Sequence, residues 1–505
     1  MEKRWANSEQ GAESGRERKR ERGPVPGLGI DLHLAPSGGA GLRRGLTDAL
    51  REAVRTGRLA PGLRLPSSRT LAADLGIARN TVADAYADLV AEGWLAARQG
   101  SGTRVADRPV PAPPRRPAAT PRVPGRPAHD LEPGSPDLGS FPRAAWLKAA
   151  RRALADAPND VFGYGDPRGR PELRTALAGY LARARGVRAD PERIVVCSGF
   201  AHGLGLLAQV LRRRGLDSLA VESYGLDAHW DLVERAGLTT RPMPFDALGT
   251  VVGDGDGDGD GGGDGGDVGD GRGGGPGGAR SGAVLLTPGH SFPLGLALPP
   301  GRRAALADWA RRTGGLVLED DYDGEFRYDR QPVGALQDLA PDRVVYLGTA
   351  SKSLAPGLRL GWLVLPPDLV TEVAETLGTS ATGVVEQLTL AEFLVSGAYD
   401  RHVRAARQRY RRRRDALVAA LAVRAPEVTV TGIAAGLHAV LRLPPGTEES
   451  VLRAAAWQGL SVFGLSRFRH PRATARAADA LVVGYATPPD HAWAGTLEAL
   501  CRALP

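Results

Sequence analysis

Apolar residues recur at helical spacing near the start of the chain. In 41–57, one helical face carries Leu42, Leu46, Leu50 and Val54, and the arginines fall elsewhere. Spacings of three and four residues are typical of an amphipathic helix. The pattern therefore predicts a helix whose apolar face packs inside a small domain.

Two shorter helical patterns and a hairpin pattern follow directly. The first has Ser67 as a candidate N-cap and Gly76 as its end. The second occupies about 78–93, and its positions spaced for burial are Val82, Ala85, Tyr86 and Leu89. In 94–105, two strand-like runs flank a Gly-Ser-Gly turn, which predicts a hairpin. Two short helices with a tight turn between them, followed by a hairpin, indicate a helix-turn-helix with a wing.

From about residue 131, strand-like and helix-like runs alternate, which predicts an α/β domain. The predicted divisions are a disordered charged tail (1–27), a winged helix-turn-helix domain (28–105), a Pro-rich linker (106–130) and the large α/β domain (131–505). Inside the large domain, 253–279 is rich in Gly and Asp but lacks the apolar residues of a calcium-binding repeat. We therefore predict a disordered surface insertion there.

Composition narrows the class of protein. The 505 residues carry a net charge of +8, which fits a polyanionic partner but also fits an Arg-rich composition with few lysines. Two cysteines make neither a disulfide framework nor the paired spacing of a zinc site. No apolar run reaches membrane-spanning length, and the N-terminus is charged. The composition therefore favours a soluble protein of the cytoplasm without a membrane anchor.

The second and third predicted helices carry candidate DNA contacts. Arg79, Asn80 and Thr81 stand at the start of the third helix, where a recognition helix presents side chains to base edges and phosphates. A purely structural role is the alternative, because Ser67 can simply cap a helix and Asn80 can hydrogen-bond the turn. The predicted DNA-binding residues are Ser67, Ser68, Arg69, Arg79, Asn80, Thr81, Arg98, Ser101 and Thr103.

A lysine lies between two apolar strands in 344–364, VVYLGTASKSLAPGLRLGWLV. The first strand delivers Lys352 into a turn rich in Ser, Gly and Pro. A lysine with partly suppressed charge offers the free amine that forms an internal aldimine with pyridoxal 5'-phosphate. Ser351, Ser353 and Arg359 then supply donors to the cofactor phosphate. The alternative, a surface lysine beside a turn, fits poorly with flanking strands this apolar.

A second strand, in 314–326, ends in carboxylates, and strand ends are where α/β folds place ligand groups. We predict that Asp320 faces the pyridine nitrogen and keeps it protonated. Tyr322, two residues further on the same face, is assigned to the phenolic oxygen. Asp321 is the alternative, because a shift of one residue in the strand register would make Asp321 face the pyridine nitrogen instead of Asp320. Metal binding by Asp320, Asp321 and Asp323 is the alternative, but the sequence shows no matching His or phosphate loop, and we predict no metal.

The segment 193–211 has the pattern of a strand, a Gly-containing turn and a helix. Backbone N–H groups of Gly199, Phe200 and Ala201 at the helix start can bind a phosphate. Many turns between a strand and a helix have this pattern. It supports a cofactor site only together with the segments that carry Lys352 and Asp320.

Residues 65–105, LPSSRTLAADLGIARNTVADAYADLVAEGWLAARQGSGTRV, resemble the winged helix-turn-helix of GntR-type bacterial regulators almost position for position. The resemblance implies double-stranded operator DNA as a partner. The family usually has Ser where Ala78 stands, and losing that N-cap costs on the order of 1 kcal/mol. DNA affinity is then expected to lean more on Ser68, Arg69 and Arg79.

The later segments resemble fold-type I aminotransferases, and the whole order resembles the MocR-type branch of GntR regulators. This resemblance implies a homodimer, arranged head to tail with domains exchanged, that senses pyridoxal 5'-phosphate and in some relatives an amino-compound effector. It assigns Tyr164 to the cofactor phosphate across the dimer interface, and His290, in the segment HSFPLG, to the cofactor site. It also points to genes of vitamin B6 or amino-compound metabolism as targets.

Three departures from aminotransferases bear on activity. The segment ESYGL at 222–226 displaces the aromatic residue that stacks on the cofactor, and Phe292 occupies the position of a catalytic Asn. The strand at 480–486 lacks the Arg that clamps a substrate carboxylate, which leaves Arg467 or Arg469 as a substitute or as surface charge. We therefore predict a regulator that uses its aminotransferase-like domain as a sensor. The alternatives are an active transaminase with a DNA-binding extension and a cofactor-free dimerisation scaffold.

Overall fold

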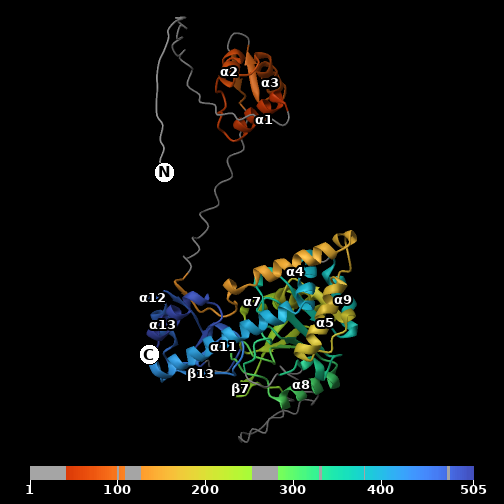
Figure 1. The fold of residues 1–505 in the computed structure, drawn as a ribbon, viewed down its shortest axis with the longest axis vertical. Helices are drawn as coiled ribbons and strands as arrows, with labels where there is room; N and C mark the ends of the chain where they lie inside the picture. Colours follow the sequence, from red (N-terminus) through yellow and green to blue (C-terminus); the bar gives the residue numbers. More distant parts are fainter. Residues whose placement is uncertain are drawn as a thin grey trace, which may run out of the picture. The chain divides into compact units, whose positions relative to one another are not determined.

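The computed structural model of the chain describes residues 41–98, 102–107, 127–252, 282–328, 333–379, 382–474 and 478–505. Contacts divide the chain into two units, Met1–Gly125 and Arg126–Pro505 (Figure 1). Several expectations lie outside the described residues: the tail 1–27, most of the linker 106–130, the insertion 253–279, Ser101 and the side chain of Arg98.

The first unit is built from three helices and a hairpin: α1 (Leu42–Arg55), α2 (Ser68–Leu75), α3 (Arg79–Ala91), and the antiparallel strands β1 (Leu95–Arg98) and β2 (Gly102–Val105). Ser67 caps α2, because its hydroxyl accepts a hydrogen bond from the N–H of Thr70. Gly76 ends α2 in the left-handed conformation, with φ 66°. The predicted helix-turn-helix and wing are confirmed.

The apolar faces of these helices form the core of the first unit. The buried positions of α1 and α3 include Leu46, Leu50, Val54, Val82, Ala85, Tyr86 and Leu89. Leu42 differs from the prediction: it is 55% exposed, because it is the first residue of α1 and precedes the buried stretch. Ala78 precedes α3 without a side-chain cap.

The second unit is built on a seven-stranded sheet in the order β4-β12-β11-β10-β9-β5-β6, in which only β12 runs antiparallel to its neighbours. The strands are β4 (Ile194–Cys197), β5 (Ser218–Glu222), β6 (Thr239–Met243), β9 (Ala283–Leu286), β10 (Leu316–Asp320), β11 (Val344–Thr349) and β12 (Gly361–Val364). Parallel strands buried on both faces have near-continuous apolar sequences, which β9 and β11 show, whereas the edge strand β6 is partly polar and exposed.

Helices cover both faces of this sheet, which agrees with the predicted α/β domain. One face packs against α6 (Phe200–Arg213), α7 (Asp227–Arg235) and α9 (Pro367–Leu377). The other packs against α4 (Arg143–Asp156), α5 (Pro171–Arg185), α8 (Pro300–Thr313) and α10 (Val384–Val395). Alternate residues of one strand serve the two faces: Val195 and Cys197 face α6, whereas Ile194 and Val196 face α5.

The C-terminal part adds a smaller layer behind the long helix α11 (Ala398–Arg424). Its four-stranded sheet has the order β13 (Thr429–Thr431), β14 (Ala439–Arg442), β17 (Ala480–Val483) and β16 (Phe463–Gly464), with α12 (Glu448–Trp457) and α13 (Trp493–Ala503). Figure 1 shows α12 and α13 at one end of this unit and α5 and α9 at the other.

Two short strand pairs complete the second unit. β3 (His129–Asp130) pairs with β15 (Leu460–Ser461), so the start of this unit is fixed to the C-terminal layer. β7 (Phe245–Asp246) pairs with β8 (Gly249–Thr250). Among the helices that the structure describes, none is both long and apolar enough to cross a membrane.

Candidate functional site

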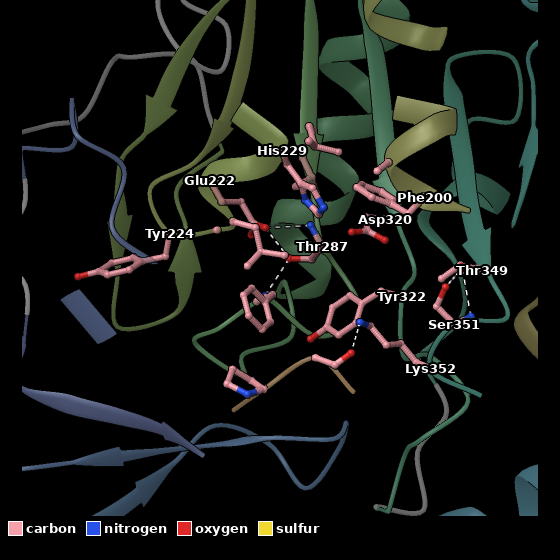
Figure 2. A pocket seen from close by; sticks show the side chains of 18 of the residues that line it. Phe200, Glu222, Tyr224, His229, Thr287, Asp320, Tyr322, Thr349, Ser351 and Lys352 are labelled. Carbon is pink, nitrogen blue, oxygen red and sulfur yellow. Dashed lines mark hydrogen bonds between the residues drawn. The ribbon is translucent and has the colours of Figure 1, made fainter. Parts of the chain in front are cut away.

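A cavity of about 290 Å³ lies at the carboxyl ends of strands β5, β9, β10 and β11. The start of α6, helix α7 and the segments around 133–134 and 437–438 close it. Of the predicted cofactor residues, those that line it are Lys352, Asp320, Tyr322, Arg359, Ser351, Phe200 and Ala201. Figure 2 shows Asp320, Tyr322 and Lys352 converging on one space, whereas Tyr224 is directed away from Lys352.

Lys352 projects into this cavity from the turn after β11. Its Nζ donates a hydrogen bond to the backbone carbonyl of Gly134, a segment more than 200 residues earlier that β3 holds in place. Burial lowers the pKa of Lys352, and the nearby Asp320 and Asp323 offset part of that effect. The lysine is therefore held with a larger neutral fraction than a solvated lysine has.

Asp320 is the last residue of β10 and is buried. Its Oδ1 has no hydrogen-bond partner among the described residues. Burial, reinforced by Asp321, raises the pKa of Asp320, and Lys352 opposes that rise. A buried acceptor left unpaired is costly, so this carboxyl group is suited to a cationic or N–H partner placed in the cavity.

Asp321, the predicted alternative to Asp320, faces elsewhere. Its carboxylate accepts two hydrogen bonds from Arg185, at 2.6 and 2.8 Å, and one from the hydroxyl of Tyr346 at 2.7 Å. It does not line the cavity. Of the two neighbouring carboxylates, only Asp320 faces the predicted cofactor position.

Behind Tyr322 lies a buried polar group. The Tyr322 hydroxyl lies 3.1 Å from His290 Nδ1, and the same nitrogen lies 2.8 Å from Asp323 Oδ2. His290 does not line the cavity; it supports Tyr322 from behind. His438 does line it, and its pKa is lowered to about 3, first by burial. Its Nε2 donates a hydrogen bond of 2.9 Å to the backbone carbonyl of Pro293, because a carbonyl oxygen only accepts.

These observations bear on the metal alternative. Asp321 is committed to Arg185, and Asp323 to His290, so Asp320, Asp321 and Asp323 do not share one centre. A different trio, His290, Asp323 and His438, has ligand-type atoms within 4.8 Å of one another, but two of its members are already joined by a hydrogen bond.

The opposite end of the cavity offers donors suited to a phosphate. Helix α6 begins at Phe200, and its first N–H groups point out of the helix start. Arg359 has φ 52°, the only positive φ outside glycine among the described residues. Gly199 lies beside the Arg359 guanidinium and has φ 86°, a backbone conformation that favours glycine. Ser351 joins this group through a 2.8 Å contact with the Thr349 hydroxyl.

Besides His290, three predicted cofactor residues do not line the cavity: Gly199, Ser353 and Tyr164. Ser353 is buried and its hydroxyl lies 2.8 Å from that of Tyr399, on the side of the turn away from the cavity. The turn after Lys352 directs this side chain into the α11 core. Tyr164 is fully exposed on the single chain.

Several cavity residues were not predicted as contacts. Glu222 ends β5, and its carboxyl group accepts hydrogen bonds from Thr287 N–H and the Thr250 hydroxyl, both at 3.0 Å; burial raises its pKa. The strand-end argument used for Asp320 also applies to Glu222. His229, on α7, has a pKa lowered to about 4, first by burial and then by Lys352. Its ring lies 4.7 Å from that of Phe200, and no local pattern indicates it.

Neither proposed substitute for the carboxylate clamp lines the cavity. Arg467 pairs with Asp227 at 2.8 Å, and Arg469 donates to the backbone carbonyl of Ala473. Phe292 lines the cavity at the predicted position of a catalytic Asn.

The predicted DNA-binding residues gather around the junction of α2 and α3. Arg69, Arg79 and Asn80 are exposed, and no hydrogen bond or ion pair joins their side chains to other described residues. The arginines of α1 differ, because Arg43 pairs with Asp88 and Arg51 with Glu92. Ser68, Thr81 and Thr103 are half-buried, and Ser67 is exposed but engaged as the cap of α2. Uncompensated guanidinium groups at a helix start suit phosphate contacts.

Two family models match the chain. Residues 42–105 match "Bacterial regulatory proteins, gntR family", and residues 130–478 match "Aminotransferase class I and II". The chain is 32% identical over 446 residues to the HTH-type pyridoxine biosynthesis transcriptional regulator PdxR of Corynebacterium glutamicum, covering 87% of this chain and 91% of that protein. It is also 32% identical over 451 residues to the probable rhizopine catabolism regulatory protein MocR of Rhizobium meliloti, covering 84% and 87%.

Solved structures match the second unit in fold. An archaeal alanine:glyoxylate aminotransferase superposes with a TM-score of 0.62 at 22% identity, over 74% of this chain and 89% of that one. LysN, the α-aminoadipate aminotransferase of Thermus thermophilus, superposes with a TM-score of 0.61 at 22% identity, over 75% and 92%. The fold-type I prediction for the large domain is confirmed.

Proposed function

Because this chain belongs to the MocR-type branch of the GntR family of transcriptional regulators, with a fold-type I aminotransferase domain, we propose that its DNA binding responds to pyridoxal 5'-phosphate held at Lys352. One observation carries the proposal: a buried lysine with a lowered pKa and a buried carboxyl oxygen with no partner among the described residues line the same cavity. That pair matches the two ends of the cofactor's reactive ring.

The residues present fit this cofactor. When bound, it supplies an aldehyde that condenses with an amine and a pyridine ring that accepts electrons. Lys352 presents the amine, and Asp320 holds a proton at the pyridine nitrogen. Tyr322, backed by Asp323 and His290, donates toward the phenolic oxygen. The phosphate is held by Arg359 and Ser351, together with N–H groups of Phe200 and Ala201.

The proposal extends to the assembly and the DNA. We place operator DNA on the residues around the start of α3, led by Arg69 and Arg79, in a cytoplasmic protein. A head-to-tail homodimer would bring the exposed Tyr164 of one subunit to the other subunit's cavity. Regulated genes of vitamin B6 or amino-compound metabolism agree with the names of the relatives, one of which is a regulator of pyridoxine biosynthesis.

An absorption titration tests the cofactor site. Adding pyridoxal 5'-phosphate to the full chain should produce an absorption band that the free cofactor does not show. The intensity of this band should saturate at one equivalent of cofactor per chain. Lys352→Ala should abolish the band, because the condensing amine is lost. Lys148→Ala is the matched control, since Lys148 is an exposed lysine of α4 outside the cavity. A band that survives Lys352→Ala would refute the site and favour the cofactor-free scaffold.

The same preparation separates the regulator from a transaminase. In a single-turnover experiment with amino acids, conversion of the bound cofactor to its amine form within seconds would favour the enzyme. Phe292 in the cavity and the engaged Arg467 and Arg469 lead us to expect no such fast conversion.

A further inference from the structure

A second hollow, of about 440 Å³, borders the loop that follows β10. We call it the α5–α11 pocket, because its walls come from the end of α5, from that loop and from the first half of α11. Its charged lining consists of Arg183, Arg185, Arg327, Arg404, Arg407 and Asp400. Five guanidinium groups thus meet one carboxylate in the lining of a single hollow.

The carboxylates nearby are already engaged. Asp400 pairs with Arg183 at 2.8 Å. Asp321, below the pocket, pairs with Arg185, whose remaining terminal nitrogen donates to Gly324 O at 3.0 Å. Arg185 is buried, and each of its three guanidinium nitrogens donates one hydrogen bond, so its position is fixed.

Arg404 and Arg407 retain free donors. Arg404 is exposed and makes no hydrogen bond or ion pair with the residues that the structure describes. Arg407 uses its Nε on the carbonyl of Glu325, at 2.9 Å, which leaves its two terminal nitrogens. The two residues are three apart on α11, where like charges repel each other. A bound anion would relieve that repulsion.

We propose that the α5–α11 pocket binds a small phosphorylated anion, a phosphate monoester or diphosphate. The planar fork of Arg matches two phosphate oxygens at once. Arg404 and Arg407 donate to the phosphate, in a lining where arginines outnumber carboxylates. The size of the hollow suits a small molecule, and its three walls enclose the ligand from different elements.

This pocket is joined to the first cavity by one ion pair. Arg185 holds Asp321 in place, and the next residue back, Asp320, lines the first cavity. An anion bound beside Arg185 would weaken the electrostatic stabilisation that Arg185 gives to the Asp321 carboxylate. Because Asp321 is among the groups that raise the pKa of Asp320, the two pockets are electrostatically coupled. Binding of the anion itself does not depend on the proposed cofactor.

Calorimetric titration of the full chain with inorganic pyrophosphate, at constant ionic strength, tests the site. We expect saturable binding that Arg404→Gln and Arg407→Gln each weaken at least tenfold. Arg411→Gln is the matched control, because Arg411 is exposed on the same helix, lies 3.8 Å from Asp415 and does not line the pocket. It should bind as the unaltered chain does. Circular dichroism of each variant verifies that it is folded.

Other results would overturn the assignment. Equal binding by all the variants would mean general charge attraction. Loss of binding in Arg359→Gln but not in Arg404→Gln would place the anion in the first cavity. If pyrophosphate did not bind while Arg404→Gln weakened binding to non-operator duplex DNA, the surface would be a nucleic-acid contact. None of these outcomes alters the Lys352 absorption test, so the two proposals fail separately.

Discussion

Asp320 and Asp321 are neighbouring carboxylates in opposite surroundings. Asp321 is bound on both oxygens by Arg185 and Tyr346, so its charge is balanced inside the fold. Asp320 has a buried oxygen with no partner among the described residues and a raised pKa. An unpaired buried acceptor costs about 1–3 kcal/mol, and a site that binds a ligand is where such a cost is retained. Asp321 therefore supports the fold, and Asp320 is the residue to which we assign the ligand contact.

A pair of substitutions separates these roles. Asp320→Asn should weaken pyridoxal 5'-phosphate binding at least tenfold, about 1.4 kcal/mol or more, with little change in thermal stability. Asp321→Asn should instead destabilise the second unit by roughly 3–5 kcal/mol, because it leaves Arg185 buried without its counter-charge. The absorption titration and thermal unfolding followed by circular dichroism measure the two effects. If both variants lost the same cofactor affinity and the same stability, the separate roles of Asp320 and Asp321 would be contradicted.

At the scale of elements, α2 and α3 differ in how they begin. Ser67 accepts from the N–H of Thr70 at 3.1 Å, so α2 has a side-chain cap. Ala78 has the extended backbone of an N-cap, φ −65° and ψ 136°, but no side chain that can accept a hydrogen bond. The start of α3, which carries Arg79 and Asn80, is therefore the less secured of the two helix starts.

Cap exchange tests this difference. Ala78→Ser should stabilise the start of α3 by about 1 kcal/mol, since its hydroxyl can accept from the N–H of Thr81, and Ser67→Ala should destabilise α2 by about the same amount. Hydrogen–deuterium exchange of the full chain should then be about fivefold slower in α3 and about fivefold faster in α2. Ser68→Ala, one position past the cap, is the control. Unchanged exchange in Ala78→Ser would show that other contacts already fix this helix start.

At the scale of the whole molecule, the proposed cofactor cavity and the proposed DNA-binding residues belong to different units, each with its own core. A ligand changes DNA affinity only if it binds two arrangements of the assembly with different affinities. The proposed homodimer supplies such arrangements by setting the spacing of two recognition helices. The proposed response to the cofactor would therefore be a property of the assembly.

Operator binding with and without pyridoxal 5'-phosphate measures the coupling. We expect at least a fivefold change, about 1 kcal/mol or more, in the unaltered chain and none in Lys352→Ala. Arg79→Ala should weaken operator binding under both conditions and reduce its salt dependence. Arg55→Ala is the control, because Arg55 pairs with Glu52 at 2.7 Å on α1. Equal operator affinity with and without cofactor would leave the cavity without a regulatory role.

The local sequence was sufficient to predict the helices and strands and the segments that carry the candidate site residues. The Ser67 cap, the Gly76 stop and the apolar spacing of α3 act within a few residues, so they predict the helix-turn-helix without knowledge of the rest. The same holds for Lys352 and Asp320, because Asp320 ends one apolar strand, Lys352 lies in the turn after another, and strand ends of one sheet meet at one edge.

Which side chains share the cavity depends instead on long-range packing. Asp320 rather than Asp321 faces it because Arg185, 136 residues away, takes the second carboxylate. Ser353 leaves it because Tyr399 of α11 binds its hydroxyl. His229 and His438 enter it from α7 and from the C-terminal layer, elements that only the packing of the chain brings to these strand ends. Short-range patterns determine the secondary structure of each segment. The direction in which a side chain points depends on partners that lie far away in the sequence and that folding brings close.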